Sequence, residues 1–244
     1  MRIDALDLKM RPRGAFEAAD LGVRMCQRHW RQIYACHALV TLPVIALCIA
    51  AVPIASWLPA PLIFLAKPWI DRTSLFVLSR AAFGQRTKPL DLWQAQRSVW
   101  WRQLLSTLTW RRLSPWRSFT QPVYQLEGLP MGPRGQRLRV VRGEYRGPAA
   151  MVSFAFGVVE TLLIVGVISL VFWLAPTEND TAQLWQSMAG EAGIWDIAAP
   201  LCYGLVVLFL EPFYVAAGFT LYLTRRSELE AWDIEQELRR AFQG

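Results

Sequence analysis

Charged side chains are scarce in this chain and almost absent from three long stretches. Asp, Glu, Lys and Arg make up 18% of its 244 residues, whereas soluble domains carry about a quarter. Residues 32–66 hold none, and two further stretches hold one acidic residue each, Glu160 in 147–177 and Glu211 in 197–224. About 20 apolar residues cross ~30 Å of hydrocarbon. Each stretch is therefore long enough to span a membrane, which argues against an ordinary soluble domain.

Signatures of soluble enzymes and of metal sites are also lacking. The chain has two histidines, and its four cysteines show no paired spacing. The sequence contains no phosphate-binding glycine loop, nucleophile elbow, metalloprotease helix or Cys-x-x-Cys motif. Cys26, His29, Cys36 and His37 carry atoms that can bind metals, but their spacing fits no zinc pattern. We therefore expect no catalytic residue, metal or cofactor, and reduced cysteines that pack as small apolar residues.

The apolar stretches predict an all-α polytopic membrane protein with four transmembrane helices. Prolines break the first uncharged run, which therefore divides into two spans. The expected spans lie at about 33–52, 58–80, 151–174 and 197–223. The second is the weakest, because it carries Lys67, Asp71 and Arg72 into the hydrocarbon. A re-entrant or interfacial segment is the alternative for that stretch.

Basic residues are absent from both expected outer loops. The turn after the first span has none, and the loop 176–196 has none but holds four acidic residues. Seven basic residues precede the first span, twelve lie in 86–146 and four follow the fourth span. Lys and Arg concentrate in cytoplasmic loops. Both termini are therefore expected in the cytoplasm, with the protein in a bacterial inner membrane.

The expected organisation is two helix pairs separated by a connector. Five regions follow one another: a cytoplasmic or interfacial N-terminal helix (1–32), a first transmembrane pair (33–83), a basic Trp-rich cytoplasmic connector (84–148), a second pair with an acidic outer loop (149–224) and a cytoplasmic amphipathic tail (225–244).

The two helix pairs resemble one another in sequence. The segment FLAKPWIDRTSLFVLSR aligns with FLEPFYVAAGFTLYLTRR so that Lys67 meets Glu211, each followed by proline. An upstream match places His37 opposite Glu160. Identities are few, so chance similarity is the alternative. A true repeat would relate the pairs by a pseudo-twofold axis along the membrane normal.

Several ionisable residues are expected inside the membrane. They are Lys67, Glu211, Glu160, Asp71, Arg72 and His37, the last near the cytoplasmic interface. Counting from the span ends at Arg80 and Arg225 places Lys67 and Glu211 roughly 20 Å inward, past mid-depth. Isolated charges there cost at least ~2.5 kcal/mol each, so we expect these two to pair. Such a pair either fixes how the helices dock or forms a substrate or proton site, and Glu160 either relays protons or bonds a neighbouring helix.

The connector contains a candidate lipid-binding helix over residues 92–110. Its apolar residues recur at helical spacing, and Trp with Arg suits the headgroup layer. The residues expected at this interface are Trp93, Arg97, Trp100, Trp101, Arg102, Trp110 and Arg111. Shorter amphipathic helices are expected over 14–32 and after the fourth span, where Ser227 and Glu230 match a capping box.

The expected partners follow from these amphipathic segments. They are anionic lipid headgroups, together with membrane or cytoplasmic proteins. Nucleic acid is not expected, because the positive-inside bias already explains the basic charge.

The run EPFYVAAGFTLYLTRRSELEAWDIEQELRR, with FVLSRAAFG and QPVYQLEGL, resembles a family of uncharacterised proteobacterial inner-membrane proteins. More loosely, the helix pairs look like the membrane domain of some glycerophosphodiester phosphodiesterases, whose catalytic residues belong to a separate soluble domain. The first resemblance implies a component found beside transglutaminase-like membrane proteins and MoxR-type ATPases, and it brings no catalytic residue.

These observations predict a non-enzymatic membrane protein that acts as a subunit or scaffold of an envelope-associated assembly. The alternative is a small transporter or lipid-handling protein that uses Lys67, Glu160 and Glu211. A membrane enzyme ranks below both.

Overall fold

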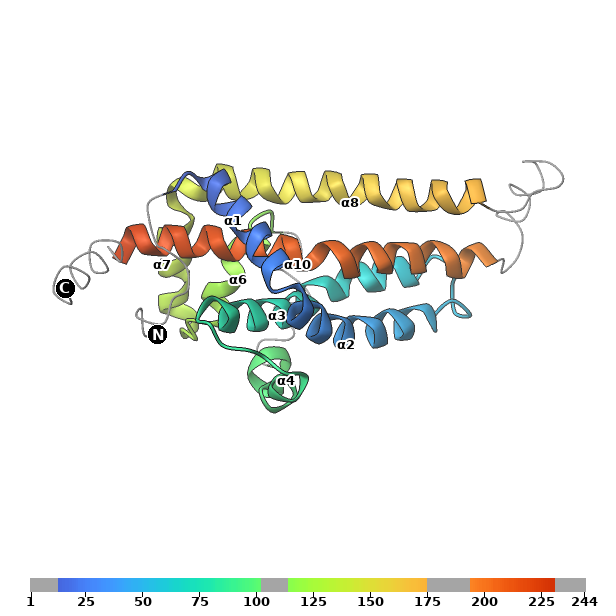
Figure 1. Ribbon diagram of the computed structural model, residues 1–244, viewed down its shortest axis with the longest axis horizontal. Coiled ribbons are helices and arrows are strands. Elements are labelled where there is room, and N and C mark those ends of the chain that lie inside the picture. The colour runs from blue at the N-terminus through green and yellow to red at the C-terminus, as the bar shows by residue number, and fades with distance from the viewer. Residues whose placement is uncertain (1–12, 102–113, 175–193, 231–244) are drawn as a thin grey trace.

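The computed structural model describes residues 13–101, 114–174 and 194–230, and every secondary-structure element in them is helical. The all-α prediction is therefore confirmed for these residues. Four long helices run along the long axis of the molecule (Figure 1): α2 (Trp30–Ile49), α3 (Pro59–Ala82), α8 (Arg146–Leu174) and α10 (Ile194–Glu230). Their positions agree with the four expected spans to within a few residues at most ends.

Within the part of the chain that the structure describes, three helical stretches are long and apolar enough to cross a membrane: Trp30–Ile49, Gly132–Leu170 and Trp195–Glu230. Their length and composition indicate an α-helical membrane protein. Large apolar side chains stand exposed along α8, among them Phe154, Leu162 and Trp173. Exposed side chains of this kind are suited to contact with lipid rather than water.

Helix α3 is longer than α2 but shorter than α8 and α10, and its second half carries four charged residues. Its 24 residues extend over about 36 Å, and it packs against both α2 and α10. Pro59 stands at its first position, where the missing N–H leaves no hydrogen bond unmade. Gly84, with φ of 68°, follows its C-terminus and reverses the chain in a conformation that favours glycine.

Shorter helices gather around the C-terminal half of α10. They are α1 (Ala15–Arg28), α6 (Arg117–Gln125) and α7 (Met131–Arg142), which is followed by a 3₁₀ turn, η4 (Gly143–Tyr145). At two crossings the backbones approach so closely that only glycine fits. A Cβ on Gly22 of α1 would lie 2.4 Å from the carbonyl oxygen of Ala216, and a Cβ on Gly218 would lie 2.4 Å from Cβ of Ser118 in α6.

The expected interfacial helix over 14–32 is two helices in the structure. The first, α1, ends at Arg28, and α2 begins at Trp30. Ala18, Gly22, Met25 and Cys26 of α1 are buried, and this helix packs mainly on α10. Its apolar face is thus covered by protein, while Phe16 on its other side stays exposed.

The candidate lipid-binding helix is interrupted within its described part. A short helix, α4 (Pro89–Gln94), is followed by a π-helical turn, η2 (Arg97–Trp101). Trp93 and Trp101 are 62% and 63% exposed, and Arg97 is exposed, as expected for an interface. Trp100 is 9% exposed and donates its indole N–H to Oγ1 of Thr73 at 3.0 Å, which places it on the protein instead. Arg102, Trp110 and Arg111 lie outside the described residues.

The expected capping box at the start of the C-terminal tail is not a helix start. Helix α10 continues without a break through Ser227 to Glu230. The hydroxyl of Ser227 donates to the carbonyl of Thr224 at 2.8 Å, a bond typical of a residue inside a helix. Glu230 instead pairs with Arg226 at 3.0 Å and with Arg137 of α7 at 2.6 Å. The remainder of the tail lies outside the described residues.

Candidate functional site: a buried ion cluster

Five charged side chains from four helices meet in the interior of the bundle. They are Lys67 and Asp71 of α3, Arg117 of α6, Glu160 of α8 and Glu211 of α10, and together they form the buried ion cluster. Lys67 and Asp71 are four residues apart on α3, and this spacing brings two side chains onto one face of a helix. The other members reach this face from neighbouring helices.

Lys67 bridges two carboxylates. Its Nζ lies 3.1 Å from Oε2 of Glu211, so the contact expected from the sequence is present. It lies closer to Glu160, at 2.7 Å from each carboxylate oxygen. One ammonium group therefore ties α3 to both α8 and α10. The sequence predicted no specific partner for Glu160, yet its carboxylate is the nearer of the two that Lys67 contacts.

Arg117 bridges the other side of the cluster. Its Nη2 donates to Oε1 of Glu211, its Nε lies 3.3 Å from Oδ2 of Asp71, and its guanidinium stacks 4.9 Å from the centre of the Tyr214 ring. A planar guanidinium suits this arrangement, because it can meet two carboxylates and an aromatic face at once. Burial alone would lower the pKa of Arg117, but the carboxylates of Asp71 and Glu211 outweigh it and raise the pKa above its ordinary value.

Four of the five side chains are almost completely shielded from solvent. The side chains of Lys67, Asp71, Arg117 and Glu211 are between 0% and 7% exposed, whereas that of Glu160 is 20% exposed. Buried charges persist only when they are paired and hydrogen-bonded. Each cation here contacts two carboxylates, and Glu211 joins the two halves by accepting from both cations. The cluster is therefore a single connected network.

The cluster lies near one end of α2. Tyr34, in the first turns of α2, donates its hydroxyl to the carbonyl of Phe209 at 2.5 Å, and its ring centre is 6.4 Å from that of Phe213. These two phenylalanines flank Glu211, so Glu211 is level with Tyr34, only ~6 Å along the axis from the start of α2 at Trp30. From Glu211 to the opposite end of α10 is about 25 Å. The cluster thus lies near the start of α2 but near the middle of the 37-residue α10.

A cavity of about 240 Å³ opens beside the cluster. Lys67, Arg117, Glu160 and Glu211 line it, together with the hydroxyl-bearing side chains of Ser114, Ser153 and Tyr214 and the apolar side chains of Phe64, Phe156 and Leu210. Tyr214 and Ser153 are hydrogen-bonded to each other at 3.1 Å. The cavity is therefore lined by charged, hydroxyl-bearing and apolar side chains. Glu160 is the most exposed member of the cluster.

Two further residues expected inside the membrane are buried but lie outside the cluster. Nδ1 of His37 is hydrogen-bonded to the hydroxyl of Ser74 at 2.9 Å, which joins α2 to α3. Arg72 of α3 donates to the carbonyl of Ser98 at 3.3 Å, and Gln125 of α6 donates to the backbone carbonyl of Arg72 at 2.8 Å. Both residues thus serve contacts between neighbouring segments.

The cysteines are free and buried, as the sequence predicted. Burial raises the pKa of the Cys26 thiol to about 12, so it stays protonated at neutral pH and is a poor nucleophile. Within the described ranges, no group of three or more His, Cys, Asp and Glu side chains is arranged to hold a metal ion.

Arg117 is the member of the cluster that the sequence did not reveal. It lies in the region 84–148, which we expected to be a basic Trp-rich cytoplasmic connector, yet residues 117–123 of α6 are all buried. One signal was available: in the otherwise basic connector, residues 118–126 contain no charge at all. An uncharged stretch beside a single arginine is compatible with a helix packed inside the bundle, but it does not reveal which carboxylates that arginine meets.

Comparison with known proteins leaves the site to be interpreted from its own geometry, because no family, curated protein or solved structure matches this chain.

Proposed function

We propose that this chain is a non-enzymatic protein of a bacterial inner membrane that serves as a subunit or scaffold of an envelope-associated assembly. The observation that carries the proposal is the mutual pairing within the buried ion cluster. Lys67 and Arg117 each contact two carboxylates and are at most 7% exposed. Charges committed to one another in this way hold helices in a defined arrangement, and such a specifying role is the best-attested use of buried ion pairs.

The same contacts support α3 as a fourth span. From Pro59 to Ala66 this helix is uncharged, and it lies beside α2, to which residues 50–58 join it directly. Its charged half begins at Lys67, where α10 and α6 pack against it. The ion cluster pairs Lys67 and Asp71, whereas Arg72 donates to the carbonyl of Ser98 and Arg80 lies 3.7 Å from Asp91. A helix of about 36 Å with its charges paired against protein is long enough to cross the bilayer.

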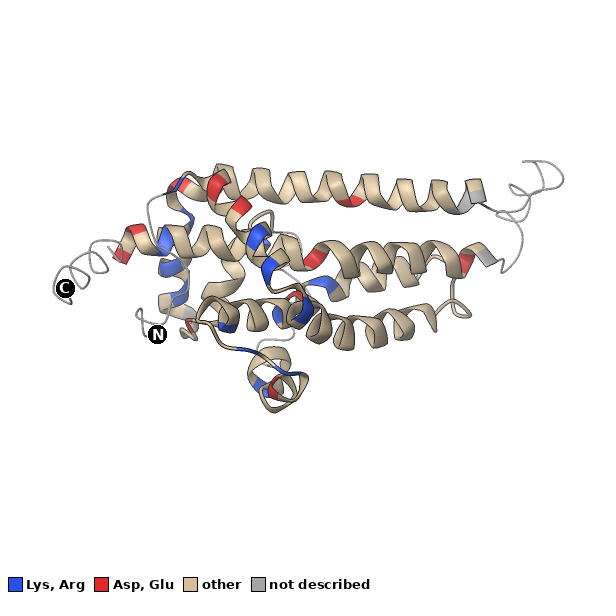
Figure 2. Ribbon diagram, in the orientation of Figure 1, with Lys and Arg blue, Asp and Glu red and all other residues tan. Residues whose placement is uncertain are grey.

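Charge distribution supports cytoplasmic termini. Figure 2 shows Lys and Arg gathered in the half of the molecule that contains α1, α4 and α7, whereas the opposite halves of the long helices are almost free of blue. Cytoplasmic flanks of membrane helices carry the excess of basic residues. We therefore assign the α1–α7 end to the cytoplasm, which places the buried ion cluster in the inner half of the bilayer.

A pseudo-repeat of two helix pairs is part of the proposal. It is supported by the contact between Lys67 and Glu211, because equivalent positions close to a twofold axis lie near each other. Pro68 and Pro212 follow them inside unbroken helices. The pairs are not equally packed: α2 packs on both α3 and α10, whereas α8 packs mainly on α10 and is otherwise largely exposed. Any symmetry is thus approximate.

Reporter fusions test the topology. A reporter that is active only outside the cytoplasm should give a signal when fused after Ser56, between α2 and α3. It should be silent when fused after Gly128, between α6 and α7, or after Gly244. A signal at Gly128 would mean that α3 does not cross, and the four-span arrangement would have to be abandoned. The matching reporter that is active only in the cytoplasm should give the inverse pattern.

A second candidate function is a small transporter or lipid-handling protein. The cavity of about 240 Å³ favours it, because an ionisable side chain, Glu160, borders space that a small polar group could enter. In this alternative, Lys67, Glu160 and Glu211 would bind the cargo or a proton, and exchange of partners within the cluster would accompany transport.

Affinity purification of the tagged full chain from native membranes distinguishes the two candidates. A subunit should co-purify with partner proteins in a fixed ratio. Glu160→Gln should leave that ratio unchanged, because the partners would contact the outer surface of the protein. Membranes from cells that lack the tag provide the background control. A chain that purifies alone, and whose loss phenotype is reproduced by Glu160→Gln at normal abundance, would overturn the scaffold proposal in favour of transport.

A further inference from the structure

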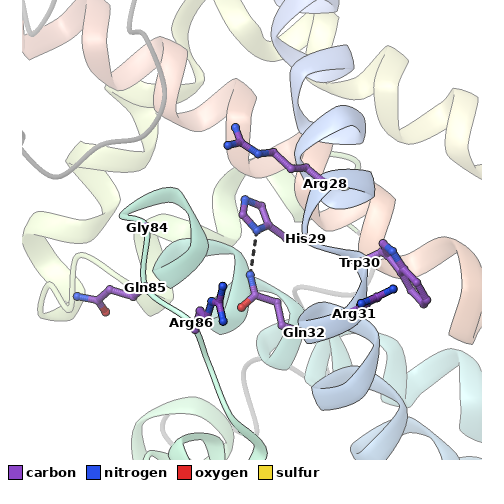
Figure 3. Close-up of a pocket in the computed structure, with 8 residues that line it drawn as sticks. All are labelled: Arg28, His29, Trp30, Arg31, Gln32, Gly84, Gln85 and Arg86. Carbon is purple, nitrogen blue, oxygen red and sulfur yellow. Dashed lines mark hydrogen bonds between the residues drawn. The ribbon is translucent and has the colours of Figure 1, made fainter.

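A large basic pocket lies where α1 meets α2. It has a volume of about 660 Å³ and is bounded on one side by residues 28–32 of the helix junction and on the other by the loop 84–86 that follows α3. Figure 3 shows Arg28, His29 and Gln32 on the side of the junction that faces the loop, with Arg86 beside Gln32. Trp30 and Arg31 border it on the opposite side of the junction.

Specific contacts hold the walls of this pocket in place. Gln32 is hydrogen-bonded through Nε2 to Nδ1 of His29 at 3.0 Å, and its Oε1 accepts the backbone N–H of Thr87 at 3.3 Å. One glutamine therefore connects the helix junction to the chain just beyond the loop. The left-handed Gly84 sets the direction in which the loop leaves α3. The pocket is thus built from packed elements rather than from surface side chains alone.

The electrostatic character of the pocket is strongly positive. Arg28, Arg31 and Arg86 line it, and none of its lining residues, all of which are described, is acidic. Arginine is well suited to phosphate because it donates two parallel hydrogen bonds.

The position of the pocket along the bundle identifies the source of that anion. It lies at the end of α2, the longest charge-free span, and Trp30 at this end is 54% exposed. Exposed tryptophans at span ends occupy the headgroup layer. Beyond the pocket, Leu39, Leu42 and Leu47 stand exposed along α2, which provides an apolar surface for acyl chains. A molecule with a phosphate at one end and hydrocarbon at the other would satisfy both parts.

We propose that this pocket binds the phosphate headgroup of one anionic phospholipid, with Arg28 and Arg86 as its principal ligands and Arg31 at its rim. Basic pockets between helices at the cytoplasmic side are a recognised form of specific lipid site. The inference requires only that the protein is embedded in a membrane. It is independent of whether the protein acts as a scaffold or as a transporter.

The test is a titration of the detergent-solubilised full chain with phosphatidylglycerol, followed by native mass spectrometry. The wild type should retain one phosphatidylglycerol at least about tenfold more tightly than phosphatidylcholine, and added salt should weaken this binding. The double variant Arg28→Gln, Arg86→Gln should bind phosphatidylglycerol at least about tenfold more weakly, since each arginine near the surface contributes independently. Both side chains are exposed, so folding should be preserved, and unchanged elution on gel filtration would show this.

A matched control removes the same charge elsewhere. Arg139 and Arg146 are also exposed but lie on α7 and at the start of α8, and the variant Arg139→Gln, Arg146→Gln should bind phosphatidylglycerol like the wild type. If both double variants lost phosphatidylglycerol binding equally, the effect would be due to overall charge, and the proposed binding site would be wrong. Displacement of the lipid by millimolar inorganic phosphate would show that the pocket takes free phosphate, and would overturn the lipid assignment.

Discussion

Replacing Arg117 with glutamine should lower the melting temperature of the purified protein on the order of 10 °C. The substitution removes the partner of Asp71 and one of the two partners of Glu211, both of which are buried. Breaking a buried ion pair from one side typically costs about 3–5 kcal/mol, and in a chain of this size each kcal/mol corresponds to roughly 2–4 °C. Thermal unfolding in detergent, followed by size-exclusion chromatography, measures the shift. Abundance in the membrane should fall in parallel.

Two further substitutions serve as comparisons for Arg117→Gln, one at the same position and one at a distant exposed arginine. Arg117→Lys should be intermediate, because it keeps the charge but loses the geometry that reaches two carboxylates and the Tyr214 ring. Arg139→Gln removes an exposed arginine and should leave the melting temperature nearly unchanged. If Arg117→Gln behaved like Arg139→Gln, the cluster would not hold the helices together. Adding Asp71→Asn to Arg117→Gln should recover part of the loss, because an unpaired charge would be removed.

Replacing Gly22 with alanine should be the most damaging change of a single methyl group in the described part of α1. The new Cβ would lie 2.4 Å from the carbonyl oxygen of Ala216 and 2.6 Å from its carbonyl carbon. Both belong to the backbone of α10, which cannot rotate out of the way as a side chain could. Overpacking of this kind costs about 1–3 kcal/mol, and more where neither backbone yields. The thermal assay described for Arg117 measures the loss.

Gly157 of α8 is the matched control for this substitution. It is also an interior helical glycine, but a Cβ there would meet nothing within 4 Å. Gly157→Ala should therefore be neutral or stabilising by up to about 1 kcal/mol, since alanine is the better helix former. Equal melting temperatures for the two variants would mean that α1 does not cross α10 at Gly22. The packing of α1 against α10 would then be wrong.

The sequence alone was sufficient to identify the membrane class and the long helices. The extent of a span is set by a run of apolar residues that must match the thickness of hydrocarbon, and this is a local property. Residues 33–52 and 151–174 were therefore assigned close to the observed α2 and α8. The contact between Lys67 and Glu211 could be predicted for a related reason, because isolated charges in apolar stretches must pair with each other or with another partner.

Only the tertiary structure decided which apolar surfaces are left for lipid to cover and which are covered by other parts of the protein. Trp93 and Trp100 occur in the same amphipathic pattern, yet Trp93 is exposed whereas Trp100 packs beside Trp69 with ring centres 5.7 Å apart. An apolar face must be covered, but the pattern does not say by what. The same holds for α1, whose buried face meets α10 rather than headgroups.

Arg117 shows the same limit for charge. Its partners Asp71 and Glu211 lie in two different helices far away in the chain, and its own segment has the composition of an ordinary connector. The sequence determined that the carboxylates in the apolar stretches needed partners, because burying an unpaired charge is costly. The packing of α6 against Gly218 decided which cation supplies one of them, because that close approach brings the Arg117 end of α6 beside Glu211.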